Sequence, residues 1–193
     1  MKNRALFLLF LALSAVSFSF THPPVRKPSK GGSKALVYPV AGTRSQIRDK
    51  WGASRAGGIR KHKGIDIHAR KGTPVVAISD GVIVSRDRTP IGGKTLWLKS
   101  TRQGWTAYYA HLDKQFVREG QAVRKGQVIG TVGNTGNART TPPHLHFGVK
   151  KGNSWVNPLP YVKGATKVPA PKMTVTKKSA PAKKKSAARK GKR

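Results

Sequence analysis

The stretch Pro143-His144-Leu145-His146-Phe147 constrains the fold of this 193-residue chain more than any other. Side chains alternate between the two faces of a β-strand, so His144 and His146 would share one face and Leu145 and Phe147 the other. Leucine and phenylalanine are typical core residues, whereas two histidines on one face can serve a single site. The stretch therefore predicts a strand with one packed face and one functional face.

Three further residues offer partners for these histidines. His62 and Asp66 stand four residues apart with Gly64 between them, and His111 lies within Tyr-Tyr-Ala-His-Leu at 108–112. Catalytic zinc takes three nitrogen or oxygen ligands and leaves a fourth position for water, so His62, Asp66 and one of the paired histidines could form such a set. In a straight strand positions i and i+4 are about 13 Å apart, and we expect Gly64 to permit a turn that brings the two side chains together.

Proton transfer at such a site would fall to histidines. The chain has only six acidic residues and lacks the His-Glu-x-x-His motif that would provide a glutamate base. Strand alternation would place Tyr109 on the same face as His111, which makes Tyr109 a candidate hydrogen-bond donor to an oxyanion. His68 would share a face with Asp66, and we prefer a surface histidine to an alternative ligand or a residue that supports a ligand.

The chain from Lys34 onward consists of short β-type runs separated by glycine, which predicts an all-β fold. Close spacing and turn residues favour an antiparallel sheet over βαβ units. Helical periodicity is absent, with at most one turn after His111. Two long loops, 49–61 and 133–143, precede the histidine candidates and predict the walls of a cleft. The expected strands cover 35–40, 65–67, 74–78, 81–85, 94–98, 104–110, 128–132 and 145–149.

Several of these motifs occur together and in a recognisable order. They are His62-x-x-x-Asp66, Tyr-x-His-Leu at 109–112, His144-x-His146, and the glycine-containing segments 72–75, 80–83, 126–130 and 132–136. In this combination the chain resembles the lysostaphin-like (LytM-type) zinc endopeptidases that cut bacterial peptidoglycan, and the resemblance covers about residues 36–161.

The resemblance implies a role for each candidate site residue. His62, Asp66 and His146 would hold one zinc ion per chain, and His111 and His144 would form the catalytic pair. The fold implied is a mainly antiparallel, lysostaphin/LytM-like peptidase domain. The function implied is a secreted zinc-dependent endopeptidase that hydrolyses peptide cross-links of peptidoglycan, in remodelling or lysis of the cell wall.

The chain departs from the family pattern at three positions. His68 stands where the family usually has a small residue, and Gly148 where it often has an acidic one. A Phe-Gly-x-Arg element is replaced here by Trp-Gly-Ala-Ser-Arg at 51–55, so Arg55 comes one place late. None of the three departures removes a candidate ligand.

The N-terminal residues predict export, and the C-terminal residues predict a disordered tail. Lys2 and Arg4 precede an uncharged run through Phe20, so residues 1–19 are predicted to be a signal peptide, with an uncleaved anchor as the alternative. We expect a linker at 20–33, the peptidase domain at 34–163 and a disordered basic tail at 164–193. The protein would be secreted to the periplasm, the cell wall or the exterior, without a transmembrane anchor after cleavage. The absence of cysteine excludes a lipoprotein anchor and disulfides.

The formal net charge of +33 predicts a polyanionic partner. The last thirty residues contain eleven lysines and arginines and no acid, and we expect them to bind anionic wall polymers or lipopolysaccharide. A nucleic-acid-binding protein is the first alternative, although an export signal and the zinc motif make nucleic acid unsuitable as the main partner. The second alternative is an inactive wall-binding or hydrolase-activating module of the same fold.

Overall fold

The computed structural model describes residues 36–170, and within them it confirms the predicted antiparallel all-β fold. The predicted signal peptide, the predicted linker and most of the predicted tail lie outside the described residues. The strands are β1 (Gln46–Asp49), β2 (Ser54–Arg55), β3 (Arg60–Lys61), β4 (Ile65–His68), β5 (Pro74–Val76), β6 (Gly81–Thr89), β7 (Gly93–Ser100), β8 (Trp105–Leu112), β9 (Lys114–Gln115), β10 (Ala122–Val123), β11 (Val128–Thr131), β12 (His144–Lys151) and β13 (Ser154–Val156). The helical segments are η1 (Ala56–Gly58), η2 (Gly136–Ala138) and α1 (Leu159–Val162).

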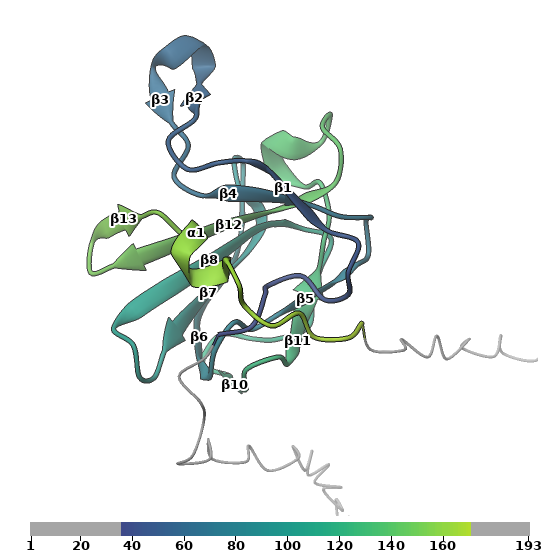
Figure 1. Cartoon of the computed structure of the whole chain (residues 1–193), viewed down its shortest axis with the longest axis vertical. Coiled ribbons are helices and arrows are strands. Elements are labelled where there is room, and N and C mark those ends of the chain that lie inside the picture. The colour runs from purple at the N-terminus through teal and green to yellow at the C-terminus, as the bar shows by residue number, and fades with distance from the viewer. Residues whose placement is uncertain (1–35, 171–193) are drawn as a thin grey trace, which may run out of the picture.

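One large sheet carries every candidate site residue except His62, which directly follows β3. Its strand order is β1-β4-β12-β8-β7-β6-β10, and β13 pairs with β12 outside that path. A second sheet, β5-β11-β9, packs beside it, and the short β2-β3 hairpin projects from the body above β4 (Figure 1). Because β12 lies between β4 and β8, its side chains have cross-strand neighbours on both sides.

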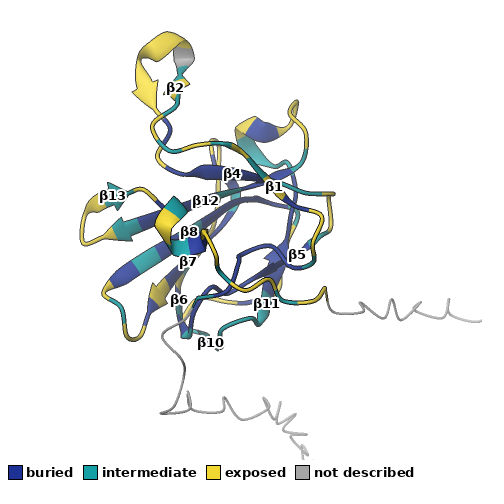
Figure 2. Ribbon diagram, viewed as in Figure 1, coloured by how far each residue is buried: buried dark blue, intermediate teal, exposed yellow. Residues whose placement is uncertain are grey.

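The predicted alternation along β12 is confirmed. Leu145, Phe147 and Val149 are completely buried, and their cross-strand neighbours on β4 and β8, such as Ile67 and Tyr109, are also buried. The central strands are accordingly dark in the burial view (Figure 2). Each such side chain contributes about 1.5–3 kcal/mol through burial, so the packed face anchors the strand that presents the histidines.

Some predicted elements are wrong at the level of detail. Within the described part of the run 35–40, Val37 and Val40 form only isolated bridges. No helical turn follows His111, because the chain continues into β9, which agrees with the expectation of at most one turn there. The α-helical turn α1, with a proline in its first turn, was not predicted. Among residues 36–170, no helix is long and apolar enough to cross a bilayer.

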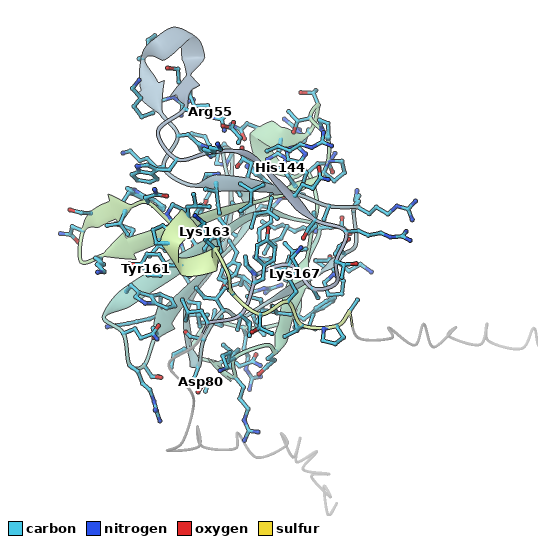
Figure 3. All side chains as sticks on the ribbon, in the orientation of Figure 1. Arg55, Asp80, His144, Tyr161, Lys163 and Lys167 are labelled. Atoms are coloured by element: carbon cyan, nitrogen blue, oxygen red, sulfur yellow. The ribbon has the colours of Figure 1, made fainter. Side chains whose placement is uncertain are left out.

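Residues 164–170, which the sequence assigned to the disordered tail, pack on the body of the domain. The N–H of Tyr38 donates to the carbonyl of Thr166, and the N–H of Gly42 donates to that of Val168, both at 2.9 Å. Val168 packs against a small cluster of buried apolar residues, and the ammonium of Lys167 lies 5.0 Å from the ring centre of Tyr38 (Figure 3). The part of the predicted disordered tail at 164–170 is therefore held on the domain, and the rest of the predicted tail lies outside the described residues.

This contact predicts that the position of a C-terminal truncation matters. A chain that ends at Lys163 loses two backbone hydrogen bonds and the packing of Val168, together about 1–2 kcal/mol. We expect its Tm to lie about 3–8 °C below that of a chain that ends at Ala170. Thermal melts followed by circular dichroism compare the two, and equal Tm values would contradict the structural role of this segment.

Candidate active site

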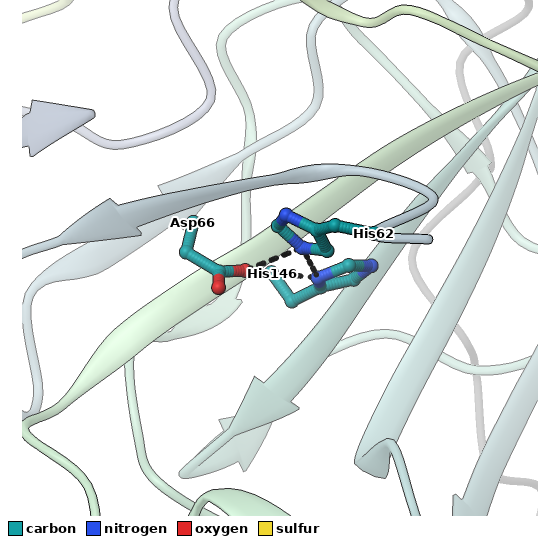
Figure 4. A group of neighbouring side chains, drawn as sticks. All are labelled: His62, Asp66 and His146. Atoms are coloured by element: carbon teal, nitrogen blue, oxygen red, sulfur yellow. Dashed lines mark hydrogen bonds and ion pairs between the residues drawn. The ribbon is translucent and has the colours of Figure 1, made fainter. Parts of the chain in front are cut away.

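Three side chains converge on one point of the large sheet: His62, Asp66 and His146 (Figure 4). The Nε2 atom of His62 lies 3.0 Å from Nδ1 of His146 and 3.2 Å from Oδ1 of Asp66, and the last two atoms are 2.9 Å apart. Ligand atoms around a tetrahedral zinc ion lie about 3.3–3.6 Å apart, so the group needs to expand by only a few tenths of an ångström. Within residues 36–170 it is the only such cluster of potential metal ligands.

The protonation of His62 supports a metal at this point. Its Nδ1 atom lies 3.0 Å from the carbonyl oxygen of Lys50, and a carbonyl can only accept, so Nδ1 carries the proton. The Nε2 atom of the neutral ring then presents a lone pair to the other two groups. Lone pairs this close repel one another unless a proton or a cation lies between them, so the donor set fits a divalent metal ion.

Gly64 is required for this convergence, but not for the reason expected from the sequence. We predicted that its backbone freedom allows the turn between His62 and Asp66, yet its φ is not among the positive values of the described residues. A Cβ atom at Gly64 would instead lie 2.5 Å from Cε1 of His146 and 2.7 Å from the carbonyl oxygen of Phe147. The missing side chain makes room for the imidazole.

Arg55 orients the carboxylate of Asp66. Its Nη2 atom lies 2.8 Å from Oδ2 of Asp66 and 2.5 Å from Oδ2 of Asp49, which leaves Oδ1 of Asp66 directed at the histidines. Arg55 is the last residue of β2, directly before η1, and its side chain reaches from the hairpin to the body of the domain (Figure 3). The one-place shift that the sequence showed at this element therefore still allows Arg55 to reach the site.

His111 and His144 form a second pair beside the first group. Their ring centres are 4.9 Å apart, and that of His111 lies 5.9 Å from that of His146. Nδ1 of His111 donates to the carbonyl of Thr135 at 2.9 Å, and Nδ1 of His144 donates to that of Pro142 at 2.8 Å. Both Nε2 atoms are therefore unprotonated in the neutral rings and can accept a proton.

Both long loops support the histidines as well as bordering the site. Loop 49–61 supplies the carbonyl of Lys50, and loop 133–143 supplies those of Thr135 and Pro142. The sequence predicted cleft walls at these loops but did not indicate which backbone groups they contribute. Such carbonyl contacts have no signature in side-chain patterns.

His111 reaches the site through an irregularity in β8. Lys94 pairs with Leu112 and Leu96 with Tyr109, so one residue of β7 faces two residues of β8. His111 has a φ of 60°, the only positive φ of a non-glycine residue within 36–170. Such a β-bulge re-aims a side chain, and here it turns His111 away from the core face.

The bulge makes the expectation for Tyr109 wrong. Tyr109 is fully buried, its ring packs on Phe147 at 5.4 Å, and its hydroxyl accepts a hydrogen bond from the N–H of Ile78. It cannot stabilise an oxyanion in the site. Tyr108 lies on the functional face instead, with its ring centre 6.0 Å from that of His146.

Burial and charge set the protonation of these groups. Burial lowers the pKa of His111 to about 4, because the imidazolium loses hydration, so the ring is neutral near pH 7. Burial also lowers the pKa of His146. Burial alone would raise the pKa of Asp66, but the close imidazoles of His146 and His62 hold it below its ordinary value. Asp66 is therefore a carboxylate, as a metal ligand must be.

His68 is half-buried and belongs to the surroundings of the site. It lies opposite His144 in the pairing of β4 with β12, and the two rings stack with centres 5.1 Å apart. It is not part of the group that could hold a metal. This stacking places His68 closer to the site than the surface position that we preferred from the sequence.

Known proteins are similar to the part of the chain that contains these site residues. Residues 60–158 match the sequence profile described as Peptidase family M23. The chain is 35% identical over 144 residues to the L-Ala--D-Glu endopeptidase of Bacillus subtilis, and 37% identical over 151 residues to the murein hydrolase activator NlpD of Salmonella dublin. These alignments cover 68% and 78% of this chain, but only 44% and 37% of the two relatives.

Solved structures agree with the fold. A zinc containing peptidase from Vibrio cholerae superimposes with a TM-score of 0.58 at 33% identity, which covers 64% of this chain and 39% of that chain. The antimicrobial peptidase lysostaphin from Staphylococcus simulans superimposes with a TM-score of 0.59 at 30% identity, over 72% of this chain and 62% of that chain.

The lowered pKa of His111 predicts an acid-sensitive stability in the metal-free protein. Between about pH 4 and 6.5 the unfolded chain binds a proton at His111 that the folded chain does not, so stability is present above this window and is lost as the pH falls. The ionisable groups that face His111 are His144, His146 and Asp66, and the comparison variant keeps all three.

The comparison variant is His111→Asn, because asparagine tolerates a positive φ and does not titrate. From pH 7 to pH 5, with a chelator present, the wild type should lose about 1–2 kcal/mol more unfolding free energy than the variant. Urea denaturation at the two pH values measures this difference. Equal losses would show that His111 is not held neutral by burial.

Proposed function

The chain belongs to Peptidase family M23, and on this premise we propose that it is a secreted, zinc-dependent endopeptidase that hydrolyses peptide cross-links of bacterial peptidoglycan. The observation that carries the proposal is that one site contains both a potential metal site and a pair of potential bases. Three potential ligand atoms lie within 3.2 Å of one another, and two imidazoles with unprotonated Nε2 atoms lie beside them. The names of relatives, such as the endopeptidase of Bacillus subtilis, support the substrate class.

In this proposal zinc is held by Nε2 of His62, Oδ1 of Asp66 and Nδ1 of His146. When bound, zinc lowers the pKa of a water molecule and polarises a carbonyl group, which is the chemistry that amide hydrolysis needs. Arg55 and the carbonyl of Lys50 fix the ligand atoms before any metal arrives, because each already holds the outer atom of a ligand side chain.

His111 and His144 perform the proton transfers in this mechanism. The Nε2 atom of one ring accepts the proton that the attacking water gives up, and the resulting imidazolium returns a proton to the leaving amine. Burial keeps His111 neutral near pH 7, so it is ready to act as a base. The bond to the carbonyl of Thr135 stabilises the imidazolium form of His111. Together with the bond from His144 to the carbonyl of Pro142, it keeps the two rings from flipping.

A second function is favoured by one set of relatives. Proteins named murein hydrolase activator are as similar to this chain as the endopeptidases are, at 36–37% identity. In that case the domain would bind a wall hydrolase instead of cutting the wall itself. The intact site favours the enzyme, because a purely structural module has no need to hold three imidazoles in one tautomer.

The two groups of residues should respond differently to substitution. We expect His62→Ala, Asp66→Ala and His146→Ala to lose bound zinc and activity together, since each removes a ligand. The variants His111→Ala and His144→Ala should keep about one zinc per chain and lose about 10²- to 10⁴-fold in kcat. Metal content by plasma mass spectrometry, measured beside turnover, decides the division. A folded but zinc-free His111→Ala protein would refute it.

Digestion of purified peptidoglycan tests the function itself. The zinc-loaded protein alone should release peptides with new amino and carboxyl termini, which mass spectrometry assigns to a particular bond. A chelator should abolish the release, and His144→Ala serves as the inactive control. If the protein releases nothing alone but accelerates an added wall hydrolase, the activator function replaces the proposed one.

A further inference from the structure

An aromatic cluster lies on the same face of the large sheet as the three potential ligands His62, Asp66 and His146, which we call the metal group. Tyr108 pairs with Gly148 on β12 and with Trp97 on β7, so these three positions form a row across the strands. The row lies two residues along β12 from His146. In the next row Lys150 pairs with Trp155 on β13. Because alternate residues of a strand share a face, both rows lie on the functional side of the sheet.

The rings of this cluster are in mutual contact. The ring centres of Trp97 and Tyr108 are 4.4 Å apart, and that of Trp155 lies 5.5 Å from Trp97 and 5.7 Å from Tyr108. The cluster continues into the active site through the 6.0 Å contact of Tyr108 with His146. All three aromatic residues are only partly buried, so they expose ring surface beside the metal ligands.

Gly148 allows the cluster to form. A Cβ atom at this position would lie 2.6 Å from Cζ3 of Trp155 and 3.2 Å from the carbonyl oxygen of Lys63. Any larger residue would therefore push the indole of Trp155 off the strand. The glycine that stands out in the sequence is explained by this close approach.

Lys150 places a cation within the cluster. Its ammonium lies 5.9 Å from the ring centre of Trp97 and 5.8 Å from that of Trp155, and the residue is half-buried. Within residues 36–170 the ion pairs involve other cations, and no carboxylate pairs with Lys150. The ammonium thus lies near two ring faces and pairs with no carboxylate of the described residues, so it is available to an incoming anion.

The distance of the cluster from the metal group determines which part of a bound peptide could contact it. Successive residues of a strand are about 3.3 Å apart, so Gly148 lies about 7 Å and Lys150 about 13 Å along β12 from His146. A peptide bound in extended form with its scissile bond at the metal group covers this distance with two to four residues. Its small side chains would pack on the rings, and a carboxylate at that distance would meet Lys150.

We propose that Trp97, Tyr108, Trp155 and Lys150 form a subsite that recognises a carboxylate-bearing residue of the substrate peptide, two to four residues from the scissile bond. The inference rests on the proposed function, because it assumes that a peptide occupies the metal site. It adds a specificity that the metal group and the histidines do not supply. The four side chains position the substrate and take no part in the proton transfers.

Peptide dimers purified from peptidoglycan provide a matched pair of probes. One portion is used as the free acid, and in the other the carboxylates are converted to amides with carbodiimide and ammonia. Quenching of tryptophan fluorescence gives the Kd of each form without any need for cleavage, since two of the four tryptophans of the chain lie in the subsite. With zinc bound, KM and kcat are measured on the same two probes.

We expect the wild type to bind the acid form about five- to tenfold more tightly than the amide form. Lys150→Met should remove this preference through Kd and KM, with kcat on the amide form unchanged. Trp155→Ala should weaken binding of both forms. Because the whole chain is basic, Lys151→Met is the control: it removes the same charge from an exposed neighbour on the other face of β12, and its preference should equal that of the wild type.

Three outcomes would overturn the inference: no preference in the wild type, a preference that survives Lys150→Met, or the same loss in Lys151→Met. Equal quenching by glycan strands stripped of their peptides would assign the cluster to sugar rings and would also overturn it. Failure of the proposed function has a different signature. In that case the carboxylate preference in binding persists, but neither probe is cleaved.

Discussion

The site depends on three hydrogen bonds from histidine Nδ1 atoms to main-chain carbonyls. Lys50, Thr135 and Pro142 accept them from His62, His111 and His144. A carbonyl accepts and never donates, so each bond leaves a lone pair on Nε2, directed into the site. One ring thereby becomes suited to bind a metal and the other two to accept protons. The chemistry of the site is thus set by backbone geometry in two loops.

The strand that carries His144 and His146 could be predicted because its residues obey a simple periodicity. His144 and His146 alternate with buried Leu145 and Phe147, and this pattern needs no knowledge of the rest of the fold. His62 and Asp66 were linked through a short separation. The pattern also predicted an antiparallel sheet, because the short runs and their turns leave no room for helical crossovers.

The errors arose where backbone geometry departs from that periodicity. At His111 an extra residue in β8 and a positive φ reverse the expected facing, so alternation chose Tyr109 where the structure has Tyr108. Gly64 was expected to serve a turn, but it serves the close approach of an imidazole. Bulges and close approaches depend on partners far away in the sequence, and local patterns carry no information about them.

The three residues of the metal group are unevenly spaced in the sequence. His62 and Asp66 are four residues apart, whereas His146 joins them from 80 residues beyond Asp66. It does so only when β12 is inserted between β4 and β8, which is among the long-range pairings that folding completes slowly. An unfolded chain offers a metal at most an incomplete set of ligands. The complete set of potential ligands, and any chemistry that needs all three of them, therefore emerges only together with the finished sheet.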